Sequence, residues 1–385
     1  MLENLSNPAP KVETGLGIRP GIEFNGNEGE AQTPGLQDGA DFKEYLQDAG
    51  FNLDEVEIIG PPRLSRWQVY DGSWRTAYKF RFRLLTGEIT DLPLLYKTAK
   101  KHVKKPAKSL QVSKTDKALV VLWSDLQVGK AGASRGGTEQ LIQRVTLVTD
   151  KLISQAKSMK PSRIIFCDVG DMIEGFESGG NPERTNDLSL MQQVDLAATM
   201  TWEALKGLAQ HTDEIVYLTV GSNHCAWRRG RVKLGDTLDD WGVHIGRTLA
   251  RLAKETELPI KFYEPETTQE SLAFDVFEDK FHIIGLFHGH QAARPDNIPA
   301  WIRGQMFGHA PTNASTIYVS GHFHHLIVKE LGNTPRGSSR FWIQAKTLDN
   351  GSDWFRAISG EDSAPGLVTF TLEKEKEFNG TVNVL

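Results

Sequence analysis

The segment Ile164–Glu174 restricts the folds open to this chain more than any other. It reads Ile-Ile-Phe-Cys-Asp-Val-Gly-Asp-Met-Ile-Glu, an apolar run of strand length that ends in Gly170 and Asp171. Continuous apolar runs are typical of parallel strands that are buried on both faces. Because open α/β sheets bind ligands at the carboxyl ends of their strands, Asp171 is a candidate functional residue. Taken alone, however, a Gly-Asp pair more often marks a turn or caps a helix.

Four further strand-like segments end in side chains that bind metals. These endings are Ser124-Asp125-Leu126-Gln127, Gly221-Ser222-Asn223-His224, His288-Gly289-His290 and Gly321-His322-Phe323-His324. Chance accounts for one or two such endings, but hardly for five in this order. Asp, Asn, Gln and His without cysteine form an oxygen and nitrogen donor set. This set suits Mn²⁺, Fe or Zn²⁺ in octahedral or five-coordinate geometry and argues against a structural zinc site.

Composition excludes several classes of protein. The formal charge of -5 excludes a uniformly basic nucleic-acid-binding protein, so any such surface must be local. Only two cysteines occur, Cys167 and Cys225, which gives no disulfide framework. Without a signal-peptide pattern or an apolar run of membrane-spanning length, the chain is expected to be cytoplasmic and not to associate with membranes.

Changes in composition along the 385 residues divide the chain into four regions. Residues 1–40 are rich in Gly, Pro, Asn and Glu, which predicts a disordered or loosely attached arm. Residues 41–95 predict a small α+β module, in which the strand Thr76–Leu84 alternates aromatic and basic side chains. Its basic face could track a phosphate backbone, although a solvated face of a half-buried strand explains it at least as well. Residues 96–117 predict a basic linker, and residues 118–385 the main domain.

In the main domain, helices and strands first alternate and then give way to strands. The predicted strands are Leu119–Trp123, Arg163–Asp168, Ile215–Val220, Ala273–Phe277, Phe281–Phe287, Thr316–Val319, Leu326–Leu331, Arg340–Gln344 and Leu367–Leu372. The predicted helices are Thr138–Ala156, Asp187–Leu208, Asp236–Lys254 and Pro299–Phe307. This order predicts an α/β fold with two packed sheets flanked by helices, rather than a plain doubly wound sheet.

The succession of the five motifs resembles that of the calcineurin-like metallophosphoesterase superfamily. The resemblance covers residues 118–350, and its most specific element is Gly321-His322-Phe323-His324. It implies a four-layer α/β/β/α sandwich with two divalent metal ions at the strand ends, of which Mn²⁺ is favoured over Fe, Zn²⁺ or Mg²⁺. A shared carboxylate holds such a pair of cations together, and Asp171 is placed to be that bridge.

The resemblance also implies a role for each motif residue. The ligands implied for the first metal are Asp125, Asp171 and His324, with Gln127 as a candidate fourth. The ligands implied for the second metal are Asp171, Asn223, His288 and His322. His224 would orient the phosphate or protonate the leaving oxygen while activated water attacks phosphorus in line. His290 is an alternative to His288, which is preferred because it directly follows a strand.

Three departures from the family pattern stand out. Gln127 replaces a histidine, and its amide oxygen is a weaker neutral donor, so the first metal is expected to bind loosely, to prefer Mn²⁺ or to be absent. Ser222 lengthens the turn before the Asn-His pair by one residue. Cys225 stands where an acidic residue commonly follows, and we expect it to be semi-buried and inert.

The segment after His224 is basic and carries a tryptophan, which fits a polyanionic substrate with arginines on phosphates and a base stacked on the indole. The candidate substrate-binding residues are Trp227, Arg228, Arg229, Arg231 and, in the loop after Asp171, Arg184. A merely solvated loop is the alternative interpretation.

Together these features predict a metal-dependent phosphodiesterase, with a DNA nuclease of endo- or exonucleolytic action as the favoured form. The Asp-Leu-Gln start and the basic segment are similar to those of phage-encoded relatives of the exonuclease subunit of double-strand-break repair complexes. The alternatives are a small-molecule or cyclic-nucleotide phosphoesterase and a non-catalytic binding scaffold with a degenerate first metal site. Oligomeric state and protein partners stay open.

Overall fold

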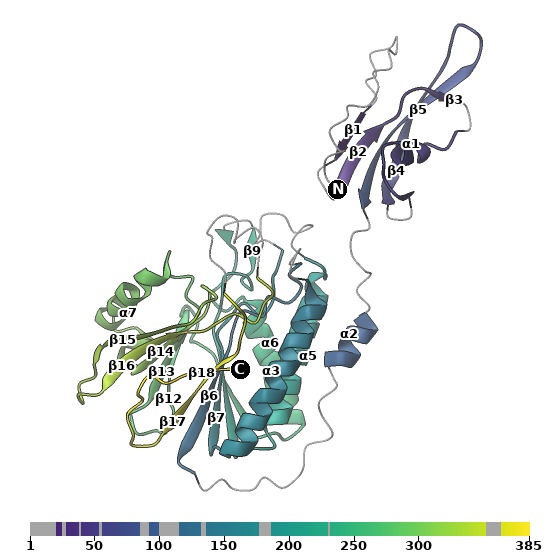
Figure 1. Cartoon of the computed structure of the whole chain (residues 1–385). Coiled ribbons are helices and arrows are strands. Elements are labelled where there is room, and N and C mark those ends of the chain that lie inside the picture. The colour runs from purple at the N-terminus through teal and green to yellow at the C-terminus, as the bar shows by residue number, and fades with distance from the viewer. Residues whose placement is uncertain are drawn as a thin grey trace. The chain divides into compact units, whose positions relative to one another are not determined.

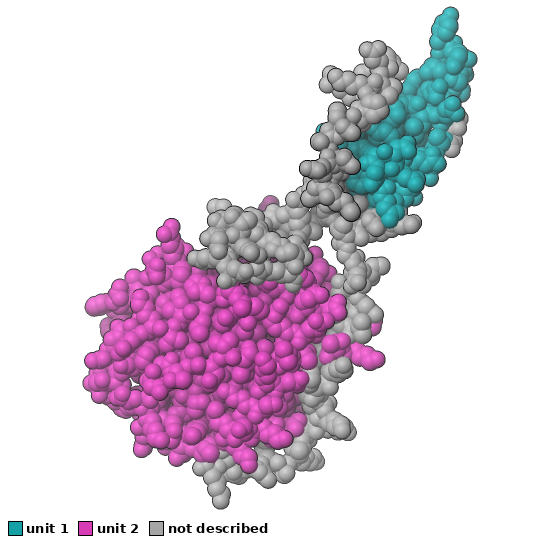
Figure 2. Space-filling view, in the orientation of Figure 1, with its two compact units in different colours: residues 1–89 teal, residues 90–385 magenta. Residues whose placement is uncertain are grey.

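The protein is described here by a computed structural model. The described residues are 21–24, 28–37, 40–53, 56–84, 92–99, 115–131, 136–176, 186–229, 232–351 and 363–385. The chain divides into two compact units, residues 1–89 and residues 90–385, which Figure 2 shows in separate colours. The elements of both units are labelled in Figure 1, and together they make a mixed α/β protein. No helix in these described ranges is both long and apolar enough to cross a membrane.

The first unit is built on one antiparallel sheet with a short helix. Its elements are β1 (Gly21–Phe24), β2 (Glu28–Gln32), β3 (Leu36–Gln37), α1 (Glu44–Asp48), β4 (Val56–Gln68) and β5 (Trp74–Leu84). Strand β5 is central, because β2, β3 and β4 all pair with it. Its side chains Phe80 and Phe82 are buried together with Leu46 of α1. The alternation predicted for this strand therefore corresponds to one core-facing and one outward-facing row.

Strands β1, β2 and β3 lie within residues 1–40, where composition predicted a disordered or loosely attached arm. For the described part of this range the structure differs from that prediction, because β2 pairs with β5 along its whole length and buries Ala31; residues 1–20 lie outside the described residues. Short polar strands of this kind are held by pairing with a neighbour rather than by their own propensity. Composition alone therefore could not identify them.

The basic row of β5 is largely compensated by acidic side chains. Lys79 forms an ion pair with Glu30, and Nη2 of Arg83 lies 2.5 Å from Oε2 of Glu57. Tyr78, Phe80 and Phe82 of the same strand face the core and are not presented for stacking on bases, whereas Trp74 at its start is exposed. These contacts favour the interpretation of the row as a solvated strand face.

The second unit contains a six-stranded sheet in the order β11-β8-β7-β6-β17-β18. The bounds are β6 (Lys117–Trp123), β7 (Arg163–Asp168), β8 (Glu214–Thr219), β11 (Ile260–Tyr263), β17 (Val368–Glu373) and β18 (Asn383–Val384). Strands β6, β7, β8 and β11 run parallel, whereas β17 and β18 are antiparallel additions at one edge. The helices packed on one face are α2 (Leu92–Ala99), α3 (Thr138–Met159), α5 (Leu190–Leu208) and α6 (Trp241–Glu255).

A five-stranded sheet packs against the opposite face of the first (Figure 1). Its strands, in spatial order, are β12 (Ser271–Asp275), β13 (Ile283–Phe287), β14 (Ile317–Ser320), β16 (Ser339–Gln344) and β15 (Ile327–Asn333). Helix α7 (Ile298–Phe307) covers its outer face. The remaining short elements are β9 (Arg228–Arg229), β10 (Val232–Lys233), η3 (Pro295–Asn297) and η4 (Pro311–Ala314).

Strand β6 illustrates why the central strands are apolar throughout. Leu119 and Val121 point to the helices, whereas Val120 and Leu122 point to the second sheet. Both faces of the strand are thereby removed from water, which excludes the polar alternation of a half-exposed strand. The polar side chains next to this strand, Lys117 at its start and Ser124 and Asp125 after it, consequently lie at its ends.

Most element boundaries differ from the predicted ones by one to five residues, for example at β12, which spans Ser271–Asp275 instead of Ala273–Phe277. Helix α6 begins at Trp241 instead of Asp236, because Asp240 caps it by accepting hydrogen bonds from the N–H groups of Gly242 and Val243 at 2.8 and 3.1 Å. Helix α2 belongs to the second unit, with Tyr96 packed on the helical core, although its residues were divided between the predicted module and linker. The rest of the predicted basic linker, residues 100–114, lies outside the described residues.

Candidate metal centre

The carboxyl ends of β6, β7, β8, β13 and β14 meet at one edge of the packed sheets. Each strand is followed there by one of the motifs identified in the sequence. Candidate ligands in these turns have left-handed backbone conformations, with φ values of 50° at Asp125, 43° at Gln127, 52° at Asp171, 72° at His322 and 64° at His324. Non-glycine residues rarely adopt this region, and they concentrate where the surrounding structure enforces a functional geometry.

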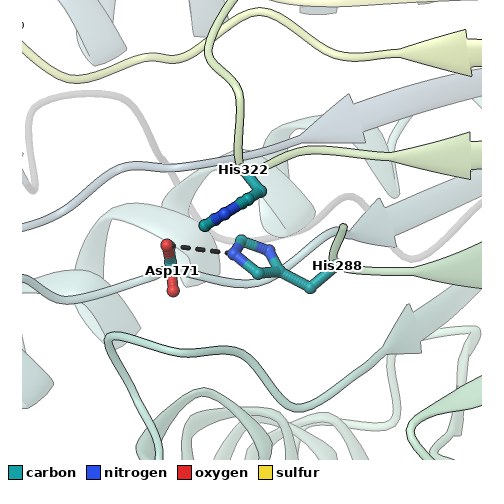
Figure 3. Close-up of side chains that lie close together, drawn as sticks. All are labelled: Asp171, His288 and His322. Carbon is teal, nitrogen blue, oxygen red and sulfur yellow. Dashed lines mark ion pairs between the residues drawn. The ribbon is translucent and has the colours of Figure 1, made fainter. Parts of the chain in front are cut away.

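Asp171, His288 and His322 form the tightest cluster of candidate ligands. One ligand atom of each residue lies within 4.8 Å of those of the other two. Figure 3 shows the three side chains directed toward one another, with His288 at the end of β13 and His322 after β14. Nε2 of His288 lies 3.0 Å from Oδ2 of Asp171 and 3.0 Å from Oδ1 of Asn223. Four of the predicted second-metal ligands are therefore brought together.

The hydrogen bonds around this cluster leave its inner atoms facing one another as acceptors. Nδ1 of His288 lies 2.7 Å from the carbonyl oxygen of Val169 and donates its proton there, which leaves the Nε2 lone pair directed inward. Oδ2 of Asp171 is buried and accepts no hydrogen bond among the described residues. Nε2 of His288 and the oxygens of Asp171 and Asn223 converge on one another, and such a set fits a divalent cation once Nε2 has lost its proton; a carbonyl-anchored histidine is a usual feature of such sites.

The electrostatics of the cluster are consistent with that fit. Although burial opposes ionisation, His288 and His224 hold the pKa of Asp171 well below its usual range. Burial and the neighbouring His288 lower the pKa of His322 to about 3, so its ring stays neutral. Burial opposes protonation of His288 too, but Asp171 raises its pKa to about 9.

Asp125 and His324 lie beside the cluster but are engaged with other groups. Both carboxylate oxygens of Asp125 accept a hydrogen bond from the backbone N–H of His322, at 3.2 and 3.1 Å, and Oδ2 also accepts one from Ser124. Oδ1 lies 3.3 Å from Nε2 of His324. Asp125 thus positions the turn that carries His322, in addition to being a candidate ligand itself.

Gln127 contacts Lys130, which in turn contacts Asp349, and sequence reasoning missed both of these charged residues. The ammonium of Lys130 donates to Oε1 of Gln127 at 2.5 Å and to Oδ2 of Asp349. Burial opposes this charge, but Asp349 and Glu174 raise the pKa of Lys130 above its usual value. Burial is likewise outweighed at Asp349, where Lys130 lowers the pKa to about 2. Lys130 lies three residues after Gln127 in the same loop, so its proximity to the first motif could have been recognised from the sequence. Asp349 stands in no motif.

His224 is held at the centre of these groups. Its backbone N–H donates to Oδ1 of Asp171 at 2.9 Å, and Nδ1 lies 2.9 Å from the carbonyl oxygen of Glu174. Nε2 lies 3.2 Å from Nε2 of Gln127 and 4.0 Å from Oδ2 of Asp171. Burial lowers the pKa of His224, but the charges of Asp171 and Glu174 prevail and raise it to about 9. The amide NH₂ of Gln127 favours the neutral form of the His224 ring instead, since it can donate a hydrogen bond only to an unprotonated Nε2.

Two other residues in or next to the motifs, His290 and Cys225, have different environments. His290 lies next to Glu270, with its Nε2 3.7 Å from Oε2, and its ring centroid is 5.5 Å from that of His288. It is therefore adjacent to the cluster rather than part of it. Cys225 is fully buried rather than semi-buried as expected, and burial together with Asp240 raises its pKa well above the usual value, which is consistent with an inert thiol.

The candidate substrate-binding residues are placed only in part. Trp227 is 53 % exposed, and its ring lies 5.7 Å from that of Trp241. Nη1 of Arg228 donates to the carbonyl oxygen of Asn223 at 3.1 Å, while its buried Nε has no hydrogen-bond partner among the described residues. Arg229 is exposed on β9. Arg184 and Arg231 lie outside the described residues.

No protein-family model matches this chain, and no curated protein matches it either. Its function must therefore be argued from the residues and their geometry.

Proposed function

We propose that this chain is a metal-dependent phosphodiesterase of the calcineurin-like type, with DNA as the favoured substrate. The observation that carries the proposal is the convergence of Asp171, His288 and His322, with an unsatisfied buried carboxylate oxygen at its centre. Such a donor arrangement is costly to bury unless it binds a cation. Mn²⁺ is the cation that we favour, because the ligands are oxygens and imidazoles without thiolate.

The arrangement of the sheets supports the fold of that superfamily. Helices α3, α5 and α6 cover the six-stranded sheet, the five-stranded sheet packs on its other face, and α7 covers the outer side. We propose that this is the four-layer α/β/β/α sandwich of the metallophosphoesterases. The position of the candidate ligands at the carboxyl ends of the strands agrees with that assignment.

Each residue of the site has a task in the proposed reaction. Asp171, Asn223, His288 and His322 would hold the cation, which would supply Lewis acidity and activate water. Asp125 fixes the turn of His322 through its backbone N–H. His224, anchored by Asp171 and Glu174, is placed to orient a phosphate oxygen or to give a proton to the leaving oxygen.

The arginine next to the site favours a phosphate-bearing substrate. Arg228 is tied to the backbone of Asn223, a proposed ligand, and its buried Nε still lacks an acceptor among the described residues. A phosphate oxygen is the acceptor that a guanidinium binds best. The half-exposed Trp227 beside it offers an aromatic face for an unpaired base. We therefore infer a nuclease that acts on exposed nucleotides, whether at ends or within a strand.

The experiment that tests the proposal is a metal-by-substrate screen of the full chain. Chelator-treated protein is reloaded with Mn²⁺, Fe²⁺, Zn²⁺ or Mg²⁺ and assayed on single-stranded DNA, duplex DNA, a cyclic nucleotide and an aryl phosphodiester. We expect Mn²⁺-dependent cleavage of DNA and of the aryl diester. Asp171→Asn should lower this rate more than about 100-fold, because it replaces the charged carboxylate ligand with a neutral amide. Asp195→Asn, on the exposed face of α5, is the matched control.

The salt dependence separates the candidate substrates. Cleavage of DNA should weaken steeply as salt rises, whereas a small-molecule diester should respond little. A small-molecule phosphoesterase is the second candidate, because a hollow of about 400 Å³ lies beside Trp227, Trp241 and Arg247. That size suits a small ligand. Hydrolysis of none of the four substrates with any of the metals would favour the binding scaffold instead.

A further inference from the structure

The loop that carries Gln127 also carries Lys130, whose positively charged ammonium group is largely buried. Lys130 is only 12 % exposed at its side chain, and its ammonium contacts Gln127 and Asp349. We infer that this ammonium takes the place of the first metal ion, so that the chain binds a single divalent cation, at the Asp171 cluster. This inference rests on the proposed function, because it concerns the number of cations in that same site.

The oxygen of Gln127 is already used. An ammonium group can only donate hydrogen bonds, so the atom of Gln127 that faces Lys130 at 2.5 Å must be its carbonyl oxygen. The amide nitrogen then faces His224, and nitrogen of an amide does not bind metals. The carbonyl oxygen of Gln127 is therefore already engaged by the lysine. The side chain of Gln127 accepts the hydrogen bond that holds the lysine in place.

The lysine is held in place from both sides. Its backbone N–H donates to the carbonyl oxygen of Gln127 at 3.1 Å, which closes a tight turn. On the other side, Asp349 is anchored by its own N–H, which donates to the carbonyl oxygen of Asp125 at 3.1 Å, and by the N–H of Gly351, which reaches its Oδ1 at 2.7 Å. The contact between ammonium and carboxylate is thus built into two fixed turns.

The remaining ligands of the supposed first site are engaged as well. Asp125 accepts hydrogen bonds from Ser124 and from the backbone of His322. His324 lies between two carboxylates, 3.3 Å from Oδ1 of Asp125 and 3.9 Å from Oδ2 of Asp349. A divalent cation among these groups would stand close to the ammonium, and like charges repel strongly where water is excluded. The residues therefore do not fit a cation at this position.

The Asp171 cluster differs from the surroundings of Gln127 in its hydrogen bonding. In the cluster, Oδ2 of Asp171 is without a hydrogen-bond partner among the described residues and the Nε2 lone pair of His288 points inward. Around Gln127, the acceptors meet a donor that the chain itself provides. Of the two positions, only the one around Gln127 already holds a positive charge from a lysine of the chain. The ammonium also supplies there the positive charge that a phosphoryl group needs.

The test counts Mn²⁺ ions on the full, chelator-treated chain. Native mass spectrometry gives the number bound, and electron paramagnetic resonance separates an isolated Mn²⁺ from an exchange-coupled pair. We expect the wild-type chain to bind one ion with the isolated-ion spectrum. His288→Ala should abolish this binding, whereas Gln127→Ala should leave it intact.

Lys130→Met removes the ammonium and keeps a similar side-chain length. It should raise the number of bound ions from one to two and produce a coupled spectrum. Lys151→Met, at an exposed position of α3, is the control and should bind one ion. Thermal melts of both variants check that they are folded. The wild-type count is informative even if Lys130→Met fails to fold.

Each other outcome has a distinct meaning. Two coupled ions on the wild-type chain would overturn the inference and leave the proposed function intact. Binding of one ion that survives His288→Ala but not Gln127→Ala would also overturn it, because the cation would then lie in the other position. A folded Lys130→Met chain that still binds one ion would reject the ammonium as the excluding group. No ion on the wild-type chain would reject the proposed function itself.

Discussion

The ion pair between Lys130 and Asp349 should be worth far more to stability than a surface pair. Asp349→Asn keeps the shape of the side chain but removes its charge, and it leaves the ammonium of Lys130 buried beside a neutral amide. Removing one partner of a buried pair costs about 3–5 kcal/mol. Gln127 still accepts from the ammonium, and Asp125 and Glu174 still act on it, so we expect the lower end of this range.

The loss is measured by thermal unfolding of the full chain after chelator treatment, so that no metal affects the comparison. A cost of about 3 kcal/mol corresponds to a decrease of about 6–12 °C in the unfolding midpoint of a large unit. Asp195→Asn, which is exposed, provides the matched loss of one charge. The double variant Lys130→Met with Asp349→Asn should recover part of the loss, because no unpaired charge stays buried.

A decrease of less than about 2 °C for Asp349→Asn would refute the reasoning, since that is the size expected for an exposed pair. Strictly additive single and double variants would refute it too. In either case the ammonium would not be held as tightly as the distances indicate. The placement of Lys130 in the reaction centre would then lose its support.

Three further predictions follow from the same geometry. His224→Ala should lower the rate of cleavage of DNA by about 10²–10⁴-fold but affect an aryl phosphodiester much less, because a good leaving group needs no proton; equal losses would exclude a role as the acid. Arg228→Met should raise KM for DNA and reduce the slope of log affinity against log salt by about one, as read from binding at several salt concentrations, and an unchanged slope would exclude contact with a phosphate. Burial raises the pKa of Asp168 to about 6 despite hydrogen bonds from Thr219, Gly170 and Tyr217, so its contribution to stability is present below about pH 4 and is lost as pH rises through 6. The difference in unfolding midpoint between the wild-type chain and Asp168→Asn should therefore change between pH 4 and 6 in favour of the variant, and a constant difference would contradict this.

The main elements could be predicted wherever the pattern is local. Strand β7 has the predicted bounds, and α3 begins at the predicted Thr138. Both are marked by apolar runs or helical spacing within a few residues. Strands β1 to β3 were missed, because their order comes from pairing with β5, which lies much later in the chain.

In the candidate site, too, the residues with a local sequence pattern could be predicted and those joined only by distant contacts could not. Asp171, His288 and His322 could be grouped from sequence, because each follows an apolar strand and parallel strands bring their ends to one edge. The contact between Lys130 and Asp349 joins residues 219 positions apart. Neither residue is marked by a strand end or by a recognisable motif, so the pair becomes visible only when the chain is folded. Sequence patterns therefore identified the candidate ligands but not the buried charge beside them.

The left-handed turns described above bear on how this surface could change over time. An aspartate, a glutamine or a histidine at such a φ costs roughly 1 kcal/mol more than a glycine would. Summed over the turns at the strand ends, that penalty is a sizeable part of the few kilocalories that keep a typical domain folded. A lineage released from chemistry would gain stability simply by accepting glycine at these turns. Glycine at one of these turns should therefore raise the stability of the chain while it removes a candidate ligand.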